Sequence, residues 1–463
     1  MLPTKIVVIG AGSASFGLNT VSALLGSERL RGSHLALVDR NAEALGLMTR
    51  LAERLNRDWQ ADMTITAHTQ HTDALDAAEF VVSAIEVPPR EKLWQMDYEI
   101  PLKYDLRQPY AENGGPGGFV HAARNIGPVL EIVHDMEAAC PEAWFINYTN
   151  PMMRICDAIA RYSEIKVVGL CHQIRAGYGM VGYVLTEELG IDIPPGEIST
   201  HADPDIWPRL GILANHALEQ VDILAAGLNH FTWMLDLRYK HTGADLYPQF
   251  AERWAAFNPA FEPLTRRVYD AFGVFPIPGD EHLCEYLPWL SDPLTKPWEK
   301  YEISLYDWTR MDTRRVTRHA EIAQMGDGRL AIDQLRQADS EGALEVIEAV
   351  AGAGQHYHLA VNLPNEGQIA NLPTGAIVET PGLSAGVGVQ PVTVGELPAG
   401  VAELCRREIA IVQLGVDAAV FGDRQVALQC LLLSPGVTDL DVAGQILDDY
   451  LQTYREHLPQ FWA

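Results

Sequence analysis

Blocks of apolar residues alternate with amphipathic stretches along the first third of the chain. Short, largely apolar runs occur in "KIVVI", "HLALV", "MTITAHT", "FVVSAIEV", "AWFINYTNP" and "KVVGLCH". Such runs are typical of strands buried on both faces of a parallel sheet. Between them, "FGLNTVSALLGSERL" and "NAEALGLMTRLAERLNRDW" repeat their apolar residues with a helical period. The alternation predicts βαβ units and therefore an α/β fold with a doubly wound parallel sheet.

The pattern changes near residue 176. Longer helical stretches, several Trp and Pro residues and the segment 361–378 indicate a second region of mixed α/β type. The chain shows no internal repeat and no low-complexity linker. We expect two closely packed domains, residues 1–175 and 176–463, with a site between them.

Composition narrows the classes of function. The formal net charge of −27 repels nucleic acid and anionic membranes, so neither is an expected partner. No apolar run reaches the length of a membrane span. The N-terminal "MLPTKIVVIGAG" continues into a glycine motif, which favours a first strand over a signal peptide. The six cysteines are scattered without a CxxC pair, so we expect no disulfide framework and a cytoplasmic location.

A glycine motif follows the first strand in "GAGSAS". Gly10 allows a tight turn, and Gly12 lets the backbone approach a pyrophosphate at a helix N-terminus. Ser15 occupies the third glycine position, so the fingerprint is incomplete. Asp39 ends the second strand, where a carboxylate favours NAD over NADP, although Arg40 weakens that preference. A glycine-rich turn without ligand is the alternative. The residues expected to bind NAD are Gly10, Gly12, Ser13 and Asp39.

Polar stretches occur where strands should end, and open α/β sheets bind ligands at such ends. They are "INYTNP", "GLCHQ" and "GLNHFTW", and a loop-like "ENGGPGGF" stands upstream of them. The glycine-rich stretch is either a loop approached by a ligand or a surface turn. Cys171 and His230 are 59 positions apart, which fits no metal motif. They are either buried structural residues or a thiolate and an imidazole that hold a divalent metal.

A further candidate lies in "PGDEHLCEYLPWL". Asp280 stands at an expected helix start as a possible N-cap, and His282 and Glu285 follow on one helix face. The side chains are either exposed charges on a capped helix or acid–base groups directed into a cleft.

Five stretches together resemble glycoside hydrolase family four, the NAD- and divalent-metal-dependent glycosidases. They are "VVIGAGSASF", "NYTNPM", "GLCH", "GLNHFTW" and "VNLPNEGQIANLPTGAIVE", in that order, and the resemblance covers nearly the whole chain. It implies a Rossmann domain like that of lactate and malate dehydrogenases, a second α/β domain, and dimers or tetramers. It also implies a mechanism in which NAD⁺ oxidises C3 of the sugar and a base removes the C2 proton beside a divalent metal. Elimination of the aglycone, addition of water and re-reduction then complete a net hydrolysis.

The resemblance also assigns residues. Cys171 and His230 match the family's metal ligands, and Asn150 matches a substrate-contacting residue near the metal. His172 follows the metal-ligating cysteine, where some members carry the acid for the leaving group, and an imidazole titrates near neutral pH.

The base that removes the C2 proton is less closely defined by the resemblance. Some members use a tyrosine in the region after the histidine ligand. We expect Asp280 to be the base, with His282 and Tyr269 as alternatives.

The substrate should be readable after the cysteine. In the family, Cys-Asp and Cys-Asn forms accompany 6-phospho-sugars and Cys-His forms accompany unphosphorylated ones. Here Gln173 and Ile174 follow Cys-His and match no substrate class, while Arg175 could pair with a uronate. We expect an NAD- and Mn²⁺-dependent α-glycosidase for an unphosphorylated hexoside such as an α-glucoside or α-galactoside. The alternatives are an α-glucuronidase or α-galacturonidase, or an NAD-dependent hydroxy-acid or polyol dehydrogenase.

Overall fold

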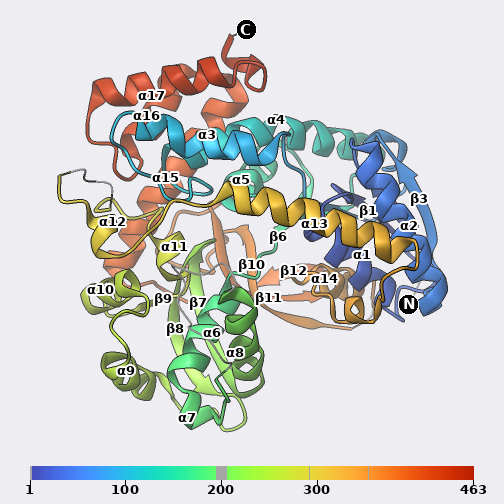
Figure 1. Cartoon of the computed structure of the whole chain (residues 1–463), viewed down its shortest axis with the longest axis horizontal. Coiled ribbons are helices and arrows are strands. Elements are labelled where there is room, and N and C mark those ends of the chain that lie inside the picture. Colours follow the sequence, from blue (N-terminus) through green and yellow to red (C-terminus); the bar gives the residue numbers. More distant parts are fainter. Residues whose placement is uncertain (1–2, 194–205, 291, 293, 353, 463) are drawn as a thin grey trace.

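A twelve-stranded sheet runs through the computed structural model, which describes residues 3–193, 206–290, 292, 294–352 and 354–462 (Figure 1). Its first half contains β1 (Lys5–Ile9), β2 (His34–Val38), β3 (Thr64–His68), β4 (Phe80–Ser83), β5 (Trp144–Asn147) and β6 (Lys166–Gly169). These six strands are parallel in the order β3-β2-β1-β4-β5-β6, which is the Rossmann order. The predicted α/β fold and all six predicted strands are confirmed.

Helices cover both faces of this parallel half. They are α1 (Phe16–Gly26), α2 (Ala42–Trp59), α3 (Arg90–Leu102), α4 (Gly115–Ala139) and α5 (Met152–Tyr162). The start of α2 is set by Asn41, whose side chain accepts hydrogen bonds from the N–H groups of Glu43 and Ala44. The two helices expected from periodicity therefore exist as α1 and α2.

The sheet continues without a break into the second half of the chain. Its antiparallel strands are β7 (Val221–Leu228), β8 (Phe231–Tyr239), β9 (Phe275–Pro276), β10 (His356–Pro364), β11 (Ile377–Ala385) and β12 (Gly388–Pro391). Asn362 of β10 pairs with Gly169 of β6, and Glu379 of β11 pairs with Gly227 of β7. The segments 1–175 and 176–463 thus share one sheet, and a boundary at residue 175 stays a prediction.

The remaining helices surround this second half and the C-terminal end. Those before β10 are α6 (Ile174–Val184), α7 (Thr186–Leu189), α8 (Ile206–Gln220), α9 (Tyr247–Ala256), α10 (Pro263–Phe272), α11 (Gly279–Leu283), α12 (Pro297–Lys300), α13 (Trp308–Gly326) and α14 (Ala343–Val350). Those after the last strand are α15 (Ala399–Phe421), α16 (Arg424–Leu433) and α17 (Leu440–Thr453). Short 3₁₀ turns lie at His71–Asp73, Asp333–Gln337 and Pro459–Trp462.

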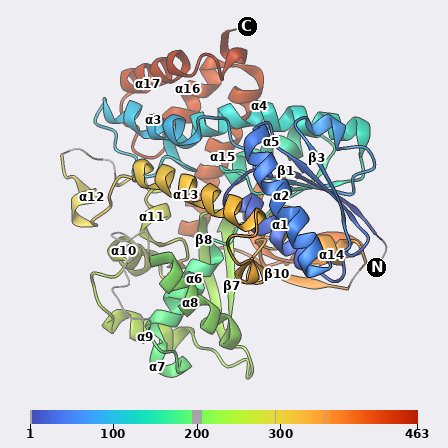
Figure 2. The same cartoon turned by 45° about the vertical axis from the view of Figure 1, so that its right-hand side comes forward.

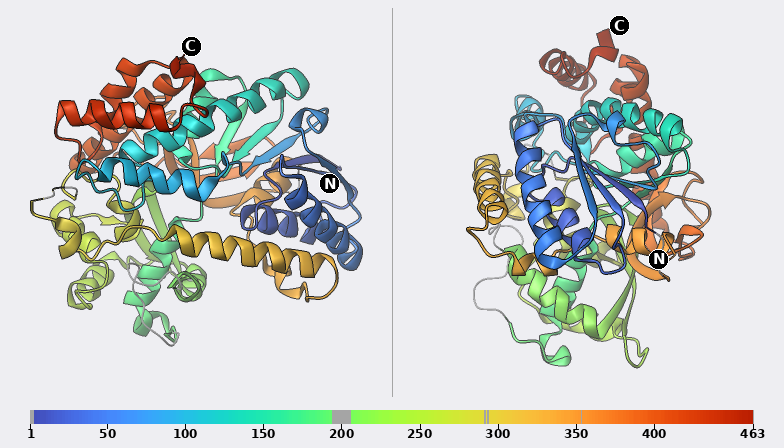
Figure 3. Two further views of the ribbon diagram at one scale, coloured as in Figure 1. Left: turned by 45° about the horizontal axis from the view of Figure 1, so that its top comes forward. Right: turned by 90° about the vertical axis from the view of Figure 1, so that its right-hand side faces the viewer.

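The C-terminal helices lie against the N-terminal part of the chain. Figures 2 and 3 show α16 and α17 beside α3 and α4. The contact includes a buried polar cluster, in which the hydroxyls of Tyr450 and Tyr454 donate to the backbone and carboxylate of Asp97. Arg124 of α4 holds the same carboxylate with two hydrogen bonds of 2.7 Å. In the described ranges, no helix is both long and apolar enough to cross a bilayer.

Candidate active site

The glycine-rich turn between β1 and α1 has the shape expected of a dinucleotide loop. Gly10 has φ of 82°, and a Cβ there would lie 2.4 Å from the carbonyl oxygen of Ala84. A Cβ on Gly12 would lie 2.7 Å from a carboxylate oxygen of Asp39. Only glycine fits either position without moving the backbone.

Asp39 shapes this loop directly. Its two carboxylate oxygens accept hydrogen bonds of 2.8 Å from the N–H groups of Gly12 and Asn41. The predicted cofactor residue Ser13 donates its N–H to the carbonyl of Gly10, which tightens the turn. The four residues expected to bind NAD therefore meet at the carboxyl ends of β1 and β2.

Asn150 and Cys171 follow the carboxyl ends of two neighbouring parallel strands, β5 and β6. The amide nitrogen of Asn150 donates to a carboxylate oxygen of Glu112 at 3.0 Å, while its buried amide oxygen has no partner among the described residues. An unpaired buried acceptor carries a desolvation penalty that a ligand donor or a cation would remove.

His230 reaches the same edge from the second half of the chain. Asn229 and His230 form the two-residue turn between β7 and β8, and His230 adopts φ of 59°. Two-residue hairpin turns need such positive φ values. Its Nε2 lies 3.4 Å from the Sγ of Cys171. A metal bound by both a sulfur and an imidazole nitrogen, at the usual bond lengths, separates the two atoms by about this distance.

The surroundings of Cys171 and His230 favour a bound cation. Burial, and then the charges of Glu341 and Glu379, raise the pKa of the Cys171 thiol well above its usual range. Burial, and then the charges of His282 and His172, lower the pKa of His230 well below its usual range. The imidazole of His230 is therefore neutral and can coordinate a metal. A bound cation would lower the pKa of Cys171 and so stabilise its thiolate.

Two further side chains complete a cluster that could hold a metal ion. One ligand atom each from Glu112, His230 and His282 lies within 4.8 Å of the others, and all three residues are buried. The rings of His230 and His282 stack at 4.3 Å between centroids and 12° between planes. Since nitrogen lone pairs lie in the ring planes, such stacked rings cannot both aim well at one ion. Glu112 is the better additional ligand.

Glu112 belongs to the stretch "ENGGPGGF", of which residues 112–114 form the expected loop and the rest is helix. From Gly115 onward this stretch is the buried start of α4, with Gly114 as N-cap. A Cβ on Gly114 would lie 2.5 Å from the carbonyl oxygen of Glu285, so the glycine permits a close approach of backbones. The carboxylate of Glu285 accepts the N–H groups of Glu112 and Asn113 at 2.8 and 3.0 Å. The helix N-terminus and this carboxylate together fix the position of Glu112.

His172 lies beside Cys171 with an exposed ring. Its Nδ1 is 2.6 Å from a carboxylate oxygen of Glu341, whose own side chain is largely buried. The charge of Glu341 raises the pKa of His172 above its ordinary value. The predicted acid thus stands at the site opening with a carboxylate that orients its ring.

The carboxylate of Asp280, the expected base, contacts the backbone at the start of α10. This buried carboxylate accepts hydrogen bonds from the N–H groups of Leu264 and Thr265, at 2.7 and 2.6 Å, and so stabilises the start of α10. It also does not cap its own helix, because Pro278 occupies the N-cap position of α11. Both carboxylate oxygens thus bind the backbone of α10, which argues against a role in catalysis, and the assignment of Asp280 as the base stays a prediction.

Of the two alternatives, only His282 is in the cluster. Tyr269 packs on Phe275, 5.6 Å between ring centroids, within an apolar cluster of the second half. His282 places Nδ1 3.5 Å from a carboxylate oxygen of Glu285. Burial lowers its pKa, but this hydrogen bond and the surrounding carboxylates outweigh burial and raise it overall.

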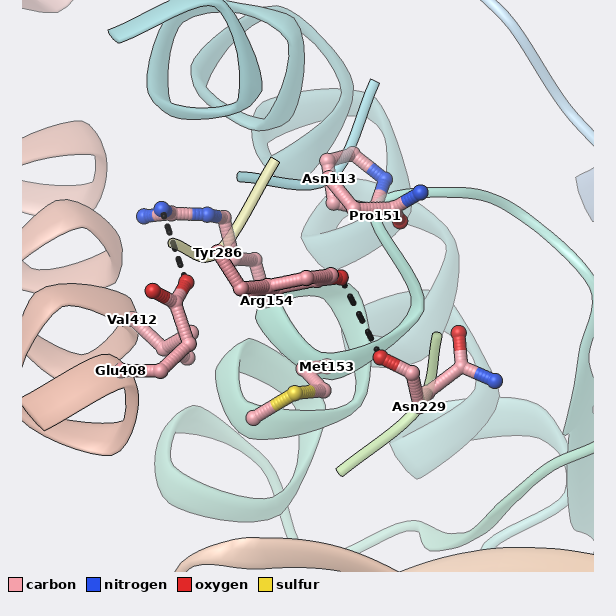
Figure 4. Close-up of a pocket in the computed structure, with 8 residues that line it drawn as sticks. All are labelled: Asn113, Pro151, Met153, Arg154, Asn229, Tyr286, Glu408 and Val412. Atoms are coloured by element: carbon pink, nitrogen blue, oxygen red, sulfur yellow. Dashed lines mark hydrogen bonds and ion pairs between the residues drawn. The ribbon is translucent and has the colours of Figure 1, made fainter. Parts of the chain in front are cut away.

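A small polar cavity adjoins the cluster (Figure 4). Asn113 and Asn229 line one side, and Arg154 and Glu408 line the other. The guanidinium of Arg154 lies 3.8 Å from Glu408, and both groups keep atoms that make no hydrogen bond to the described residues. Burial raises the pKa of Glu408 to about 7, although Arg154 lowers it.

Sequence reasoning missed several contributors. Glu112 and Asn113 were visible only as part of a glycine-rich stretch, although an acidic residue directly before such a stretch was a usable signal. Glu341 and Glu379 stand near Cys171 only because β10, β11 and the segment before α14 reach this sheet edge. No pattern in the neighbouring sequence identifies Glu341 or Glu379 as part of the site.

The fold and the site define an α/β enzyme with a dinucleotide loop and a thiol–imidazole pair at one sheet edge. The chain belongs to family 4 of the glycosyl hydrolases: the model of that family matches residues 5–185, and the model of its C-terminal domain matches residues 225–437.

Relatives of this chain act on different sugars. An α-glucosidase from Erwinia rhapontici is 30% identical, over 93% of this chain and 94% of its own. An α-galacturonidase from Bacillus subtilis (strain 168) is also 30% identical, over 97% of each chain. A 6-phospho-α-glucosidase from gut microorganisms, solved in complex with NAD and Mn²⁺, is 20% identical with a TM-score of 0.80, over 99% of this chain and 100% of its own. At that identity the likeness shows the fold.

Proposed function

We propose that this protein is an NAD- and divalent-metal-dependent α-glycosidase for an unphosphorylated hexoside. The observation that carries the proposal is the 3.4 Å approach of Cys171 Sγ and His230 Nε2 in a member of this family. The pair lies at the same edge of the sheet as the dinucleotide loop.

The residues present fit both groups. The glycine cradle and Asp39 would hold NAD, and Cys171, His230 and Glu112 would hold the metal, for which Mn²⁺ is our proposal. NAD would take a hydride from the sugar and return it, and the cation would stabilise negative charge on a sugar oxygen. Asn150, with its unpaired amide oxygen, would position a sugar hydroxyl beside them.

Two histidines supply the proton chemistry in this proposal. His172 stands at the opening, oriented by Glu341, and donates a proton to the leaving oxygen. His282 lies deeper, against His230 and Glu285, and takes the place of Asp280 as the base. The two rings come from different elements, the turn after β6 and helix α11.

The side chains after Cys171 favour a neutral sugar. Arg175 already contacts Asn215 and lies 3.7 Å from Asp339, so a uronate would have to compete for it. Gln173 is buried, accepts from Thr232 with its amide oxygen, and keeps an amide N–H₂ without a partner among the described residues. Such a donor suits a hydroxyl oxygen. Relatives at equal identity act on glucosides and galacturonides, so overall identity does not choose the sugar.

A panel of p-nitrophenyl glycosides tests the proposal. The enzyme is incubated with NAD⁺, Mn²⁺ and thiol and offered the α-gluco, α-galacto, α-glucurono, α-galacturono and one 6-phosphate compound. Nitrophenol release without net NADH is expected on a neutral α-glycoside. Stoichiometric NADH with no nitrophenol would identify a dehydrogenase and refute it.

A matched pair of variants ties the activity to the site. Cys171→Ser should abolish activity and the dependence on added metal. Cys156→Ser is the control, because Cys156 lies in α5 and its thiol contacts Met152. A serine there can donate to a helix carbonyl. Equal activity of both variants would contradict the assignment of Cys171.

A further inference from the structure

Helix α13 crosses the outside of the molecule, and its buried side chains lie near its two ends. Trp308 at one end, and Ile322 and Met325 at the other, are buried. Between them seven consecutive residues, 312–318, are all exposed. Seven residues make almost two turns, so every face of the helix is open there. A helix exposed on all sides is typical of one that bridges two parts of a protein across solvent.

The inner face of α13 can be located from its contacts. Arg315 donates to Glu91 at the start of α3 at 2.9 Å, and one turn later His319 donates its Nε2–H to the carbonyl of Gly12 at 3.0 Å. Trp308 and Ile322, seven positions before and after Arg315, share this face. The C-terminal half of the helix therefore lies against Gly12 of the dinucleotide loop.

Arg315 is exposed although it lies at the centre of that inner face. Its side chain keeps 45% of its surface open, and Arg318, one turn away at the edge of the face, keeps 57%. Beneath the helix, Arg315 reaches Glu91, whose side chain keeps 15% of its surface open, and His319 reaches Gly12. The exposed surface of Arg315 therefore lies near Gly12, where a cofactor pyrophosphate would approach the backbone.

The positive charge of residues 310–318 indicates the kind of group that this face of α13 would bind. Residues 310–318 contain four arginines and a single acid, Asp312, in a protein of net charge −27. Asp312, Arg315 and Arg318 already form ion pairs, and one of these joins Arg315 to Glu91 of α3. Exposed ion pairs of this kind contribute little, and a phosphate oxygen would replace them readily.

We propose that α13 is a basic strap over the dinucleotide groove, and that Arg315 and Arg318 bind the pyrophosphate of the cofactor. This inference rests on the proposed use of NAD. The hydrogen bond from His319 holds α13 against the backbone of Gly12. The guanidinium groups of Arg315 and Arg318 then bind the pyrophosphate from the solvent side.

Equilibrium binding of NADH, followed by its fluorescence, tests the strap without turnover. Arg315→Gln and Arg318→Gln should each weaken NADH binding about tenfold, the loss typical of one charged hydrogen bond. Arg315→Lys should keep most of the affinity. The control is Arg253→Gln, because Arg253 also has two acidic partners and 46% exposure but lies on distant α9. It should bind NADH like the parent.

Titrations with NADH and with NADPH, together with the assay for nitrophenol release, separate the possible outcomes. A pyrophosphate contact predicts equal losses for NADH and NADPH, and a shallower dependence of the dissociation constant on KCl in the double variant. Unchanged NADH binding in the double variant would overturn the strap, as would a loss confined to NADPH. A parent that binds NADH normally but releases no nitrophenol would refute the proposed glycosidase and leave the strap standing. A parent that fails to bind NADH overturns both.

Discussion

Replacing Glu408 by Gln should make the protein's stability less dependent on pH. Glu408 lies in the cavity behind the site, 3.8 Å from Arg154, with a carboxylate oxygen that accepts no hydrogen bond from the described residues. Burial raises its pKa to about 7 from 4.5. Between these values the folded protein keeps a proton that the unfolded chain has lost, so a rise in pH destabilises the fold.

The size of the effect follows from the two pKa values. At 1.36 kcal/mol per pH unit, a move from 4.5 to about 7 corresponds to about 3 kcal/mol. The contribution of Glu408 is fully present below pH 4.5 and is lost as the pH rises through 7. Gln cannot ionise, so the stability of the variant relative to the parent should rise by about 3 kcal/mol between pH 4.5 and pH 8.

Urea unfolding at fixed protein concentration measures this difference at several pH values. The control is Glu403→Gln on the same helix, where the side chain is 74% exposed and pairs with Arg406. Its relative stability should change little with pH. A Glu408→Gln difference that stays constant from pH 4.5 to pH 8 would refute the reasoning, whatever its absolute value, because only the ionisation of Glu408 makes this difference depend on pH.

Three other changes test separate parts of the structure. Asp280→Asn should lower the free energy of unfolding by about 1–2 kcal/mol, since it weakens the cap of α10. Its kcat, measured well below the melting temperature, should stay near that of the parent. A complete loss of kcat would instead support Asp280 as the base. Gly12→Ala should abolish NADH binding in a fluorescence titration, because a Cβ would meet Asp39 at 2.7 Å; binding at parental affinity would contradict the cradle. Cys171→Ser and His230→Asn should each weaken Mn²⁺ binding, seen by electron paramagnetic resonance, by at least tenfold; retained binding in both would remove the metal from this pair.

Local patterns in the sequence were sufficient for the parallel half of the sheet. Runs such as "KIVVI" and "HLALV" are buried on both faces, and burial of that kind leaves an unambiguous signature. The dinucleotide loop could be located because Gly10 and Gly12 directly follow the first strand in the sequence, although the atoms that exclude a side chain there belong to Ala84 and Asp39.

What the sequence could not supply depends on contacts between distant segments. Asp280 was read as the cap of its own helix and a candidate base, but its partners are the N–H groups at the start of α10. The glycine-rich stretch looked like a loop, since glycines are rare inside helices, yet from Gly115 onward it is the start of α4, and Gly114 before it packs against the backbone of Glu285. Neither outcome is encoded in neighbouring residues.

Cys171 and His230 show the intermediate case. Spacing alone favours buried structural residues over a metal site, and the ordered family motifs assign them as metal ligands. The structure adds that they meet because a two-residue hairpin presents His230 to the end of β6.

The pairing of β10 with β6 has a consequence for synthesis of the chain. The segment 1–185 ends its sheet at β6, whose outer edge is covered by residues more than 185 positions further on. Until that segment leaves the ribosome, a buried strand edge beside the Cys171 thiol faces solvent, and such edges promote association between chains. The order of translation thus leaves Cys171, the proposed metal ligand, beside an open strand edge until residues 356–385 are made. An N-terminal fragment produced alone should aggregate unless residues 356–385 are supplied in trans.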